Sequence, residues 1–300
     1  MTTSLKGLVS SWLSNLLSNI TRYKIVKIAQ QGNFDVIHLN SLVLFPLADS
    51  RFPFVVHVRE LIDSDFKNVL PKYVKEARGI IFIDDVVAEP FEKLTIPYRL
   101  VLANPFNLLN QNEMQLTKAH LEFLERIRDK FVIAIVGRVT VEKGIAFLLK
   151  FLSKFPDPRI NLVVVGDGEM LFSCEQFALK DKRLIVLGEQ ENVSFIYKHA
   201  DLVVRGDDIP RVGRTVYEAV LSGACVLLPG VSANYPSDLL ERFPEQVLFY
   251  QTRSVGDFTS RVEELLAREK KRAKDGVAGG GYEVNSLLEF YREASVHSIN

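Results

Sequence analysis

Three glycine-containing segments hold the residues best suited to chemistry. The first reads GRVTVEKG over residues 137–144 and directly follows an apolar run, so Arg138 and Lys143 would bring two positive charges to one loop. Glycine at the end of a parallel strand lets the backbone approach a phosphate, which Arg binds at two points and Lys as a compact charge. Taken alone the loop is a weak signal, because basic loop residues are commonly just solvated.

The other two segments follow later in the chain. Residues 165–169 read VGDGE, which lacks the spacing of a dinucleotide fingerprint or a Walker loop, and a tight turn without a ligand explains it equally well. Residues 210–219 read PRVGRTVYEA, in which Gly213 would open a helix whose first amides favour an anion. Glu218 could accept two hydrogen bonds from a ribose diol. Its spacing from Thr215 is also that of a capping box, so capping its own helix is an equal alternative.

Composition excludes several classes of protein. The 300 residues predict about two domains. Lys plus Arg and Asp plus Glu both number 37, which argues against a nucleic-acid binder, and 47% hydrophobic residues argue against disorder. Cys174 and Cys225 have no second Cys or His at metal-ligand spacing, which indicates reduced thiols. Since no apolar run reaches the roughly 18 residues that span a bilayer, we expect a cytoplasmic protein.

The elements that must position these segments alternate along the chain. Ten short runs rich in Val and Ile are typical of strands buried on both faces of a parallel sheet. They are Val36–Leu39, Phe54–Val58, Ile80–Ile83, Leu100–Ala103, Phe131–Val136, Ile160–Val165, Leu184–Leu187, Leu202–Val204, Cys225–Leu228 and Val247–Tyr250. Helical patterns such as Gly144–Lys154 and Arg214–Gly223 lie between them. The alternation predicts an α/β fold, with ligands beyond the carboxyl ends of the strands.

A turn at Asn104-Pro105 and the aperiodic residues after it divide the chain. We predict two Rossmann-like domains facing a cleft: the first over residues 1–112 and the second over residues 113–283. A C-terminal helix over residues 284–300 could pack back on the first domain.

Residues 1–30 differ from the rest of the chain. Apolar residues recur there at steps of three and four, Ser and Asn fill the opposite face, and Lys and Arg are the only charged residues. A basic amphipathic helix that carries a Trp, here Trp12, can lie in a membrane interface. Such stripes more commonly pack on their own domain. Peripheral membrane contact through residues 1–20 therefore stays an alternative to simple packing.

Together, the ordered segments resemble the nucleotide-sugar domain of GT-B glycosyltransferases. The most similar group is family 4, whose members are retaining and metal-independent. Residues 34–39 resemble a strand of that family's first domain, residues 54–60 (FVVHVRE) its active-site His segment, and residues 101–107 its interdomain turn. The first domain would thus be the acceptor side and the second would bind the nucleotide sugar.

The resemblance implies a role for each candidate residue. Arg138 and Lys143 would hold the leaving diphosphate. His57, the third catalytic residue, would approach the donor sugar from the first domain and help to orient it or the acceptor. A lone His beside a strand is more often a core residue, but its surrounding segment favours the active-site role. The donor-binding residues would be Gly137, Gly168, Gly213, Arg214, Thr215 and Glu218. No metal or cofactor is implied, because the leaving diphosphate can take the proton of the acceptor.

Two departures from the family pattern favour a different function. The family pairs two glutamates, and the first would fall on Pro210; Asp207 or Asp208 could substitute, two or three residues early. The family also begins with a strand that we do not find, which predicts an abbreviated N-terminal domain. Both departures favour a non-catalytic GT-B-like subunit, or degenerate homologue, that binds a partner glycosyltransferase.

The prediction that accounts for most residues is an enzyme. It would move a sugar from a nucleotide-diphosphate donor to a glycan or lipid-linked acceptor in surface polysaccharide biosynthesis. If the first helix faces outward, the enzyme would lie at the inner face of the membrane. Homo- or hetero-oligomers are both compatible with the sequence.

Overall fold

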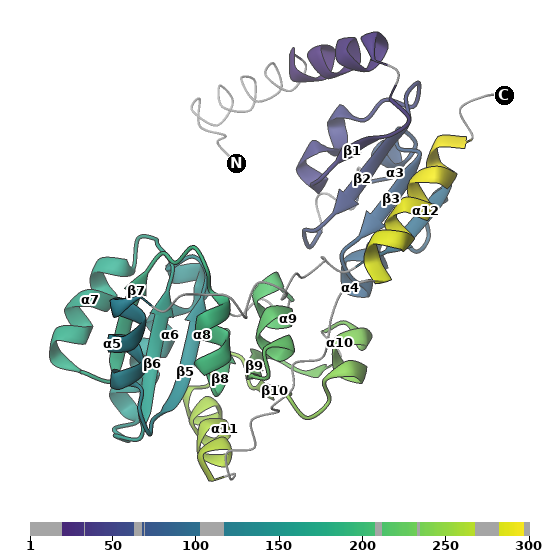
Figure 1. Cartoon of the computed structure of the whole chain (residues 1–300). Helices are drawn as coiled ribbons and strands as arrows, with labels where there is room; N and C mark the ends of the chain where they lie inside the picture. The colour runs from purple at the N-terminus through teal and green to yellow at the C-terminus, as the bar shows by residue number, and fades with distance from the viewer. Residues whose placement is uncertain are drawn as a thin grey trace, which may run out of the picture. The chain divides into compact units, whose positions relative to one another are not determined.

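The computed structural model describes residues 20–32, 34–62, 68, 70–102, 117–207, 212–232, 235–267 and 282–296. The chain forms two compact units (Figure 1). Unit 1 combines Met1–Pro105 with Gly281–Asn300, and unit 2 is the continuous segment Phe106–Gly280. The division at residue 112 that the sequence predicts falls within residues 103–116, outside the described residues.

Unit 2 is built on a parallel sheet with the strand order β10-β9-β8-β5-β6-β7 among the described residues. The strands are β5 (Phe131–Val136), β6 (Ile160–Val165), β7 (Leu184–Gly188), β8 (Leu202–Val204), β9 (Cys225–Pro229) and β10 (Val247–Tyr250). From β5 the chain runs to β6 and β7 on one side, then returns to β8 on the other. The strand order therefore reverses between β5 and β8, which is where open α/β sheets bind ligands.

Helices cover both faces of this sheet. Alternate residues of the strands enter two apolar clusters: Val132 and Ala134 of β5 lie in one and Ile133 and Ile135 in the other. The first cluster includes residues of α5 (Lys118–Arg126), α8 (Ser194–His199), α9 (Arg214–Leu221) and α10 (Ser237–Arg242). The second includes residues of α6 (Ile145–Lys154), α7 (Leu171–Lys180) and α11 (Val255–Ala267). Burial on both faces explains the continuous apolar strands.

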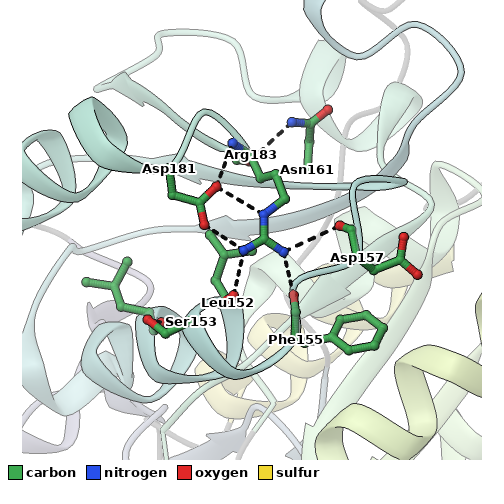
Figure 2. A network of polar contacts seen from close by, with 8 residues as sticks. Leu152, Ser153, Phe155, Asp157, Asn161, Asp181 and Arg183 are labelled. Carbon is green, nitrogen blue, oxygen red and sulfur yellow. Dashed lines mark hydrogen bonds and ion pairs between the residues drawn. The ribbon is translucent and has the colours of Figure 1, made fainter.

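Arg183, the residue before β7, connects three segments at the amino ends of the strands (Figure 2). Its guanidinium donates to Leu152 O at 2.7 Å, near the end of α6, and to the carbonyl of Phe155. The same group pairs with Asp181 Oδ2 at 2.6 Å. The last carbonyls of a helix lack partners within it, so Arg183 satisfies groups that would otherwise need water.

Unit 1 holds a parallel sheet in the order β1-β2-β3-β4 in the part that the structure describes. The strands are β1 (Ile37–Leu39), β2 (Phe54–Val58), β3 (Gly79–Phe82) and β4 (Tyr98–Val101). The cluster on one face includes residues of η1 (Leu42–Leu47), α3 (Leu70–Val74), α4 (Asp85–Ala88) and η2 (Glu89–Phe91).

The other face of the unit 1 sheet is covered from the far end of the chain. Helix α12 (Tyr282–Val296), yellow in Figure 1, buries Phe290 and Ala294 against Val55 and Ile81. A Cβ atom on Gly79 would lie 2.6 Å from the ring of Phe290, so a larger residue there would displace the ring that packs on the sheet.

The predicted fold class is confirmed, and all ten predicted strands are present. The largest shift is in β4, predicted over Leu100–Ala103 and found over Tyr98–Val101. Its residues alternate between half-buried and exposed, so a search for continuous apolar runs places this edge strand too late. Residues 20–31 are helical, with Ala29 buried; residues 1–19, which carry most of the predicted stripe, lie outside the described residues. None of the described helices is long and apolar enough to cross a bilayer.

Candidate functional site

The turns after β5, β6 and β8 pack against one another backbone to backbone. Gly144 has φ 75°, and a Cβ atom there would lie 1.9 Å from the backbone of Gly206. Gly166 has φ 128°, and its Cβ would lie 1.8 Å from Gly137 O. Because L residues avoid this conformation and no side chain would fit, glycine is required at both positions. These contacts bring the carboxyl ends of the three strands to one place.

Hydrogen bonds hold the first two predicted segments together. Val139 N donates to Asp167 O at 2.8 Å, and Met170 N donates to Val139 O at 2.9 Å. Val141 N donates to Glu169 Oε1 at 3.2 Å, beside η4 (Val141–Lys143). The structure therefore places residues 137–144 next to residues 165–169, with Gly137 and Gly168 both at positive φ.

Lys143 lies beside a buried carboxylate. Its Nζ is 3.9 Å from Asp207 Oδ2, and Arg205 forms an ion pair with the same oxygen. Asp207 is only 4% exposed, whereas the Lys143 side chain is partly open to solvent. Arg138 is exposed on the same turn. The β5 turn thus carries two cations, one exposed and one beside the Asp207 carboxylate.

Glu218, on helix α9, accepts hydrogen bonds from two side chains. The N-cap of α9 is Gly213, which makes no side-chain capping bond, and Thr215 lies inside the helix. The capping-box alternative for Glu218 is therefore wrong. Instead Glu218 Oε2 accepts from the Tyr197 hydroxyl at 3.0 Å and Oε1 from Arg214 Nε at 2.9 Å. Asp208 and Pro210 lie outside the described residues.

His57 lies within β2, buried on the face that α12 covers. Its ring centroid is 5.6 Å from that of His38 on β1, whose Nδ1 is 2.5 Å from the Tyr291 hydroxyl of α12. Burial, with Arg59 and His38 nearby, lowers the pKa of His57 to about 4. His57 is thus a neutral imidazole near pH 7, and its buried Nε2 has no partner among the described residues.

Glu60, two residues after the end of β2, is bonded to the start of η1. Burial opposes its charge, but hydrogen bonds from Ser41 Oγ at 2.5 Å and Leu42 N at 2.9 Å outweigh that effect and lower its pKa. These bonds connect the end of β2 to η1. In the described part of the chain, no group of three or more His, Cys, Asp or Glu residues could hold a metal ion.

Sequence reasoning missed three contributors to these sites: Tyr197, Arg205 and His38. The Arg214–Glu218 pair has a readable signal, because residues four apart share one face of a helix. Tyr197 has none, because it precedes Glu218 by 21 residues and meets it only through packing of α8 on α9. His38 and His57 become neighbours only through the register that pairs His38 with Val55.

The family model for glycosyl transferases group 1 matches residues 118–278, more than half of the 300 residues. The chain belongs to this family. The match contains every predicted donor-binding residue of this glycosyltransferase-family chain, together with Arg138 and Lys143, whereas His57 lies outside it.

Two proteins of Methanocaldococcus jannaschii, both called uncharacterised glycosyltransferases, are similar to this group 1 chain. One is 23% identical over 159 residues, which is 50% of this chain and 39% of the relative. The other is 30% identical over 110 residues, which is 34% of this chain and 28% of the relative. The chain therefore aligns with well under half the length of each.

Solved structures show the fold of this family member. HepE of Anabaena in complex with UDP-glucose aligns with a TM-score of 0.66 at 17% identity, covering 91% of this chain and 80% of that chain. A glycosyltransferase from Rickettsia africae aligns with a TM-score of 0.62 at 14% identity, and the alignment covers 99% of this chain and 77% of that chain. Sucrose-phosphate synthase from Thermosynechococcus elongatus aligns with a TM-score of 0.62 at 15% identity, and the alignment covers 92% of this chain and 72% of that chain. The GT-B fold predicted from the sequence is confirmed.

Proposed function

We propose that the chain is a glycosyltransferase that moves a sugar from a nucleoside diphosphate donor to a glycan or lipid-linked acceptor. The observation that carries this proposal is the packing of the β5, β6 and β8 turns at the reversal of strand order, with Lys143 of the β5 turn beside Asp207 of the β8 turn. HepE, which shares the fold, is described with UDP-glucose bound. The family 4 resemblance supports a retaining, metal-independent reaction.

Each residue of this site has a part in the proposed reaction. Lys143 and Arg138 would stabilise the charge that grows on the diphosphate as its bond to the sugar breaks. The first amides of α9, at Gly213–Thr215, would face the same group, and Glu218 would accept from the ribose hydroxyls. The acceptor oxygen forms the new bond to the sugar, and its proton passes to the leaving phosphate oxygen. His57 would orient the donor sugar as a neutral imidazole.

Calorimetry with UDP, GDP, ADP and CDP tests the donor site. We expect one of them to bind the full chain, and Lys143→Ala to weaken that binding by about 1–3 kcal/mol, the range for a charge-assisted hydrogen bond. Lys180→Ala is the matched control, because Lys180 is an exposed residue at the end of α7 that precedes β7, away from the carboxyl ends of the strands. Failure of all four nucleotides to bind would remove the donor site.

A non-catalytic subunit is the second candidate function. It is favoured by Pro210, which stands where the family has its first glutamate, and by the abbreviated first domain that we propose. An enzyme should release nucleoside diphosphate from its donor sugar with acceptor present, and His57→Ala should abolish most of that release while nucleotide binding persists. A non-catalytic subunit should bind the nucleotide at most. Any nucleoside diphosphate that it releases should be the same in amount with His57→Ala.

We also propose that the enzyme works at the inner face of the membrane, in surface polysaccharide biosynthesis. The helix at residues 20–31 exposes Ile20, Tyr23 and Ile28 beside Lys24 and Lys27, and it contains no acidic residue. Apolar and basic residues on one exposed face favour anionic lipid. In flotation assays the chain should bind phosphatidylglycerol vesicles and release them when both lysines are changed to Glu. Equal recovery with phosphatidylcholine vesicles would contradict this location.

A further inference from the structure

The carboxylate of Glu218 is held by two donors of different kinds. Tyr197 of α8 donates its hydroxyl proton to Oε2, and Arg214 of α9 donates to Oε1. Tyr197 is 1% exposed, whereas the Arg214 side chain is 68% exposed. An exposed ion pair is screened by water and restrains its partners weakly. The buried phenol is therefore the main restraint on the Glu218 side chain.

The ring of Tyr197 is itself fixed in the core of unit 2. It lies in the apolar cluster that includes Val216 and Val220 of α9 and Val132 and Ala134 of β5. A ring packed in this way has one rotamer, so its hydroxyl has one position. Burial and the charge of Glu218 raise the pKa of Tyr197 well above its ordinary value, so the hydroxyl keeps its proton and remains a donor.

Glu218 keeps capacity for a ligand after both contacts are made. An ionised carboxylate accepts about four hydrogen bonds, and the described contacts use two. The Glu218 side chain is 17% exposed and Tyr197 is 1% exposed, so solvent reaches Glu218 and is excluded from the tyrosine. A diol that approaches from solvent can therefore reach Glu218, whereas Tyr197 is buried behind it.

We propose that Tyr197 is a positioning residue that fixes the Glu218 carboxylate in the orientation that accepts the ribose diol of the donor nucleotide. This inference rests on the proposed function, because it assumes that Glu218 binds ribose. According to this inference, the preference for a ribonucleotide over a deoxyribonucleotide depends on Tyr197 of α8 as well as on Glu218 of α9. Without the phenol proton, Glu218 would turn toward Arg214 and solvent.

Tyr197→Phe tests the proposal, because it removes one hydroxyl and leaves the ring in its cluster. Calorimetry should use the nucleoside diphosphate that binds the wild-type chain and its 2′-deoxy analogue. We expect the wild type to bind the ribonucleotide about tenfold more tightly than the analogue, since one charge-assisted hydrogen bond is at stake. Tyr197→Phe should bring that ratio to within about twofold, with the analogue's own Kd unchanged. A merely structural role would weaken both ligands together.

Tyr235→Phe is the matched control. Tyr235 belongs to the same cluster, and its buried hydroxyl donates to Pro229 O at 2.7 Å and not to Glu218. This variant should keep the wild-type ratio. Tyr197→Leu is a second variant and should lose the ratio as Tyr197→Phe does. In a Glu218→Gln background, Tyr197→Phe should change the ratio no further, because both substitutions act on one contact.

The possible failures are distinguishable. If no nucleoside diphosphate binds the wild type, the proposed function and this inference both fail. If the wild type shows no ribose preference, or Glu218→Gln keeps it, Glu218 is not the ribose ligand and the inference is overturned while the donor site stands. If Glu218→Gln loses the preference and both Tyr197 variants retain it, Tyr197 has no positioning role.

Discussion

His57 and His38 are neighbouring imidazoles on adjacent strands of unit 1, and burial lowers the pKa of both. An imidazole whose pKa falls on folding takes up its proton more readily in the unfolded chain. Its contribution to stability is complete above the unfolded pKa of 6.5 and is lost as the pH falls toward the folded value of about 4. Unit 1 is therefore expected to weaken in mild acid.

Denaturant unfolding of unit 1 at pH 7 and pH 5 measures this effect. The shift of His57 alone should lower the free energy of unfolding by about 2 kcal/mol between the two pH values. His57→Asn cannot take up the proton, so most of the decrease should disappear, while the contribution of His38 remains. A decrease as large as that of the wild type would show that His57 titrates normally in the folded chain.

Individual residues were predictable where their partners lie close in the sequence. The positive charges of the 137–144 loop and the pair of glycine turns could be read directly, because each turn follows its own strand. The Lys143–Asp207 and Tyr197–Glu218 contacts could not, since each joins segments that the sheet order brings together. Thr215 and Glu218 had capping-box spacing, but the helix begins one residue before Thr215 and removes that option.

At the scale of elements, the approach of the β5 turn to the β8 turn depends on bare backbone. Gly144→Ala would place a Cβ within 1.9 Å of Gly206 and force a positive φ on an L residue. We expect a loss of at least about 2 kcal/mol in thermal unfolding, together with weaker nucleotide binding as Lys143 moves.

Gly256→Ala is the control for that experiment. Gly256 lies in α11, where a Cβ would meet nothing within 4 Å, and the same substitution should stabilise the chain by about 0.5–1 kcal/mol. If Gly144→Ala leaves the melting temperature unchanged, or raises it as Gly256→Ala should, the close approach of the two turns is not essential.

The Arg183 network gives a second element-scale prediction. Arg183→Met keeps much of the apolar stem but leaves the carbonyls of Leu152 and Phe155 and the Asp181 carboxylate short of donors (Figure 2). We expect unit 2 to lose about 2–3 kcal/mol in urea unfolding, as for hydrogen bonds to a charged group.

Arg159→Met is the comparison for the Arg183 experiment. Arg159 pairs with Asp157 at 2.6 Å, but its side chain is mainly exposed. Arg159→Met should lower the free energy of unfolding by less than about 1 kcal/mol. Equal costs would mean that the hydrogen bonds of Arg183 to the Leu152 and Phe155 carbonyls contribute little.

For the whole molecule, the sequence predicted the fold class and the strands, because buried parallel strands have a continuous apolar pattern. It could only suggest where residues 284–300 would pack, since the residues of α12 do not indicate which sheet the helix covers. The structure buries Phe290 and Ala294 of that helix in unit 1. Unit 1 is thus assembled from both ends of the chain.

Phe290→Ala measures how much unit 1 depends on that helix. Removing a buried ring should destabilise it by about 3–5 kcal/mol. Hydrogen exchange should therefore speed up in peptides from β2 and β3, while peptides from β5 and β6 keep their protection. Leu288→Ala, an exposed position on the same helix, should change neither set. Equal acceleration in both units would show that α12 does not serve unit 1 alone.

Helix α12 also sets an order of events during synthesis on the ribosome. The strands of unit 1 are translated first, yet one face of their sheet waits for residues 282–296, which emerge after all of unit 2. Unit 2 is one continuous segment and can complete its core as it appears. The amino-terminal segment of unit 1 therefore completes its packing last, and a ribosome that stalls before α12 leaves Val55 and Ile81 open to chaperones or to aggregation.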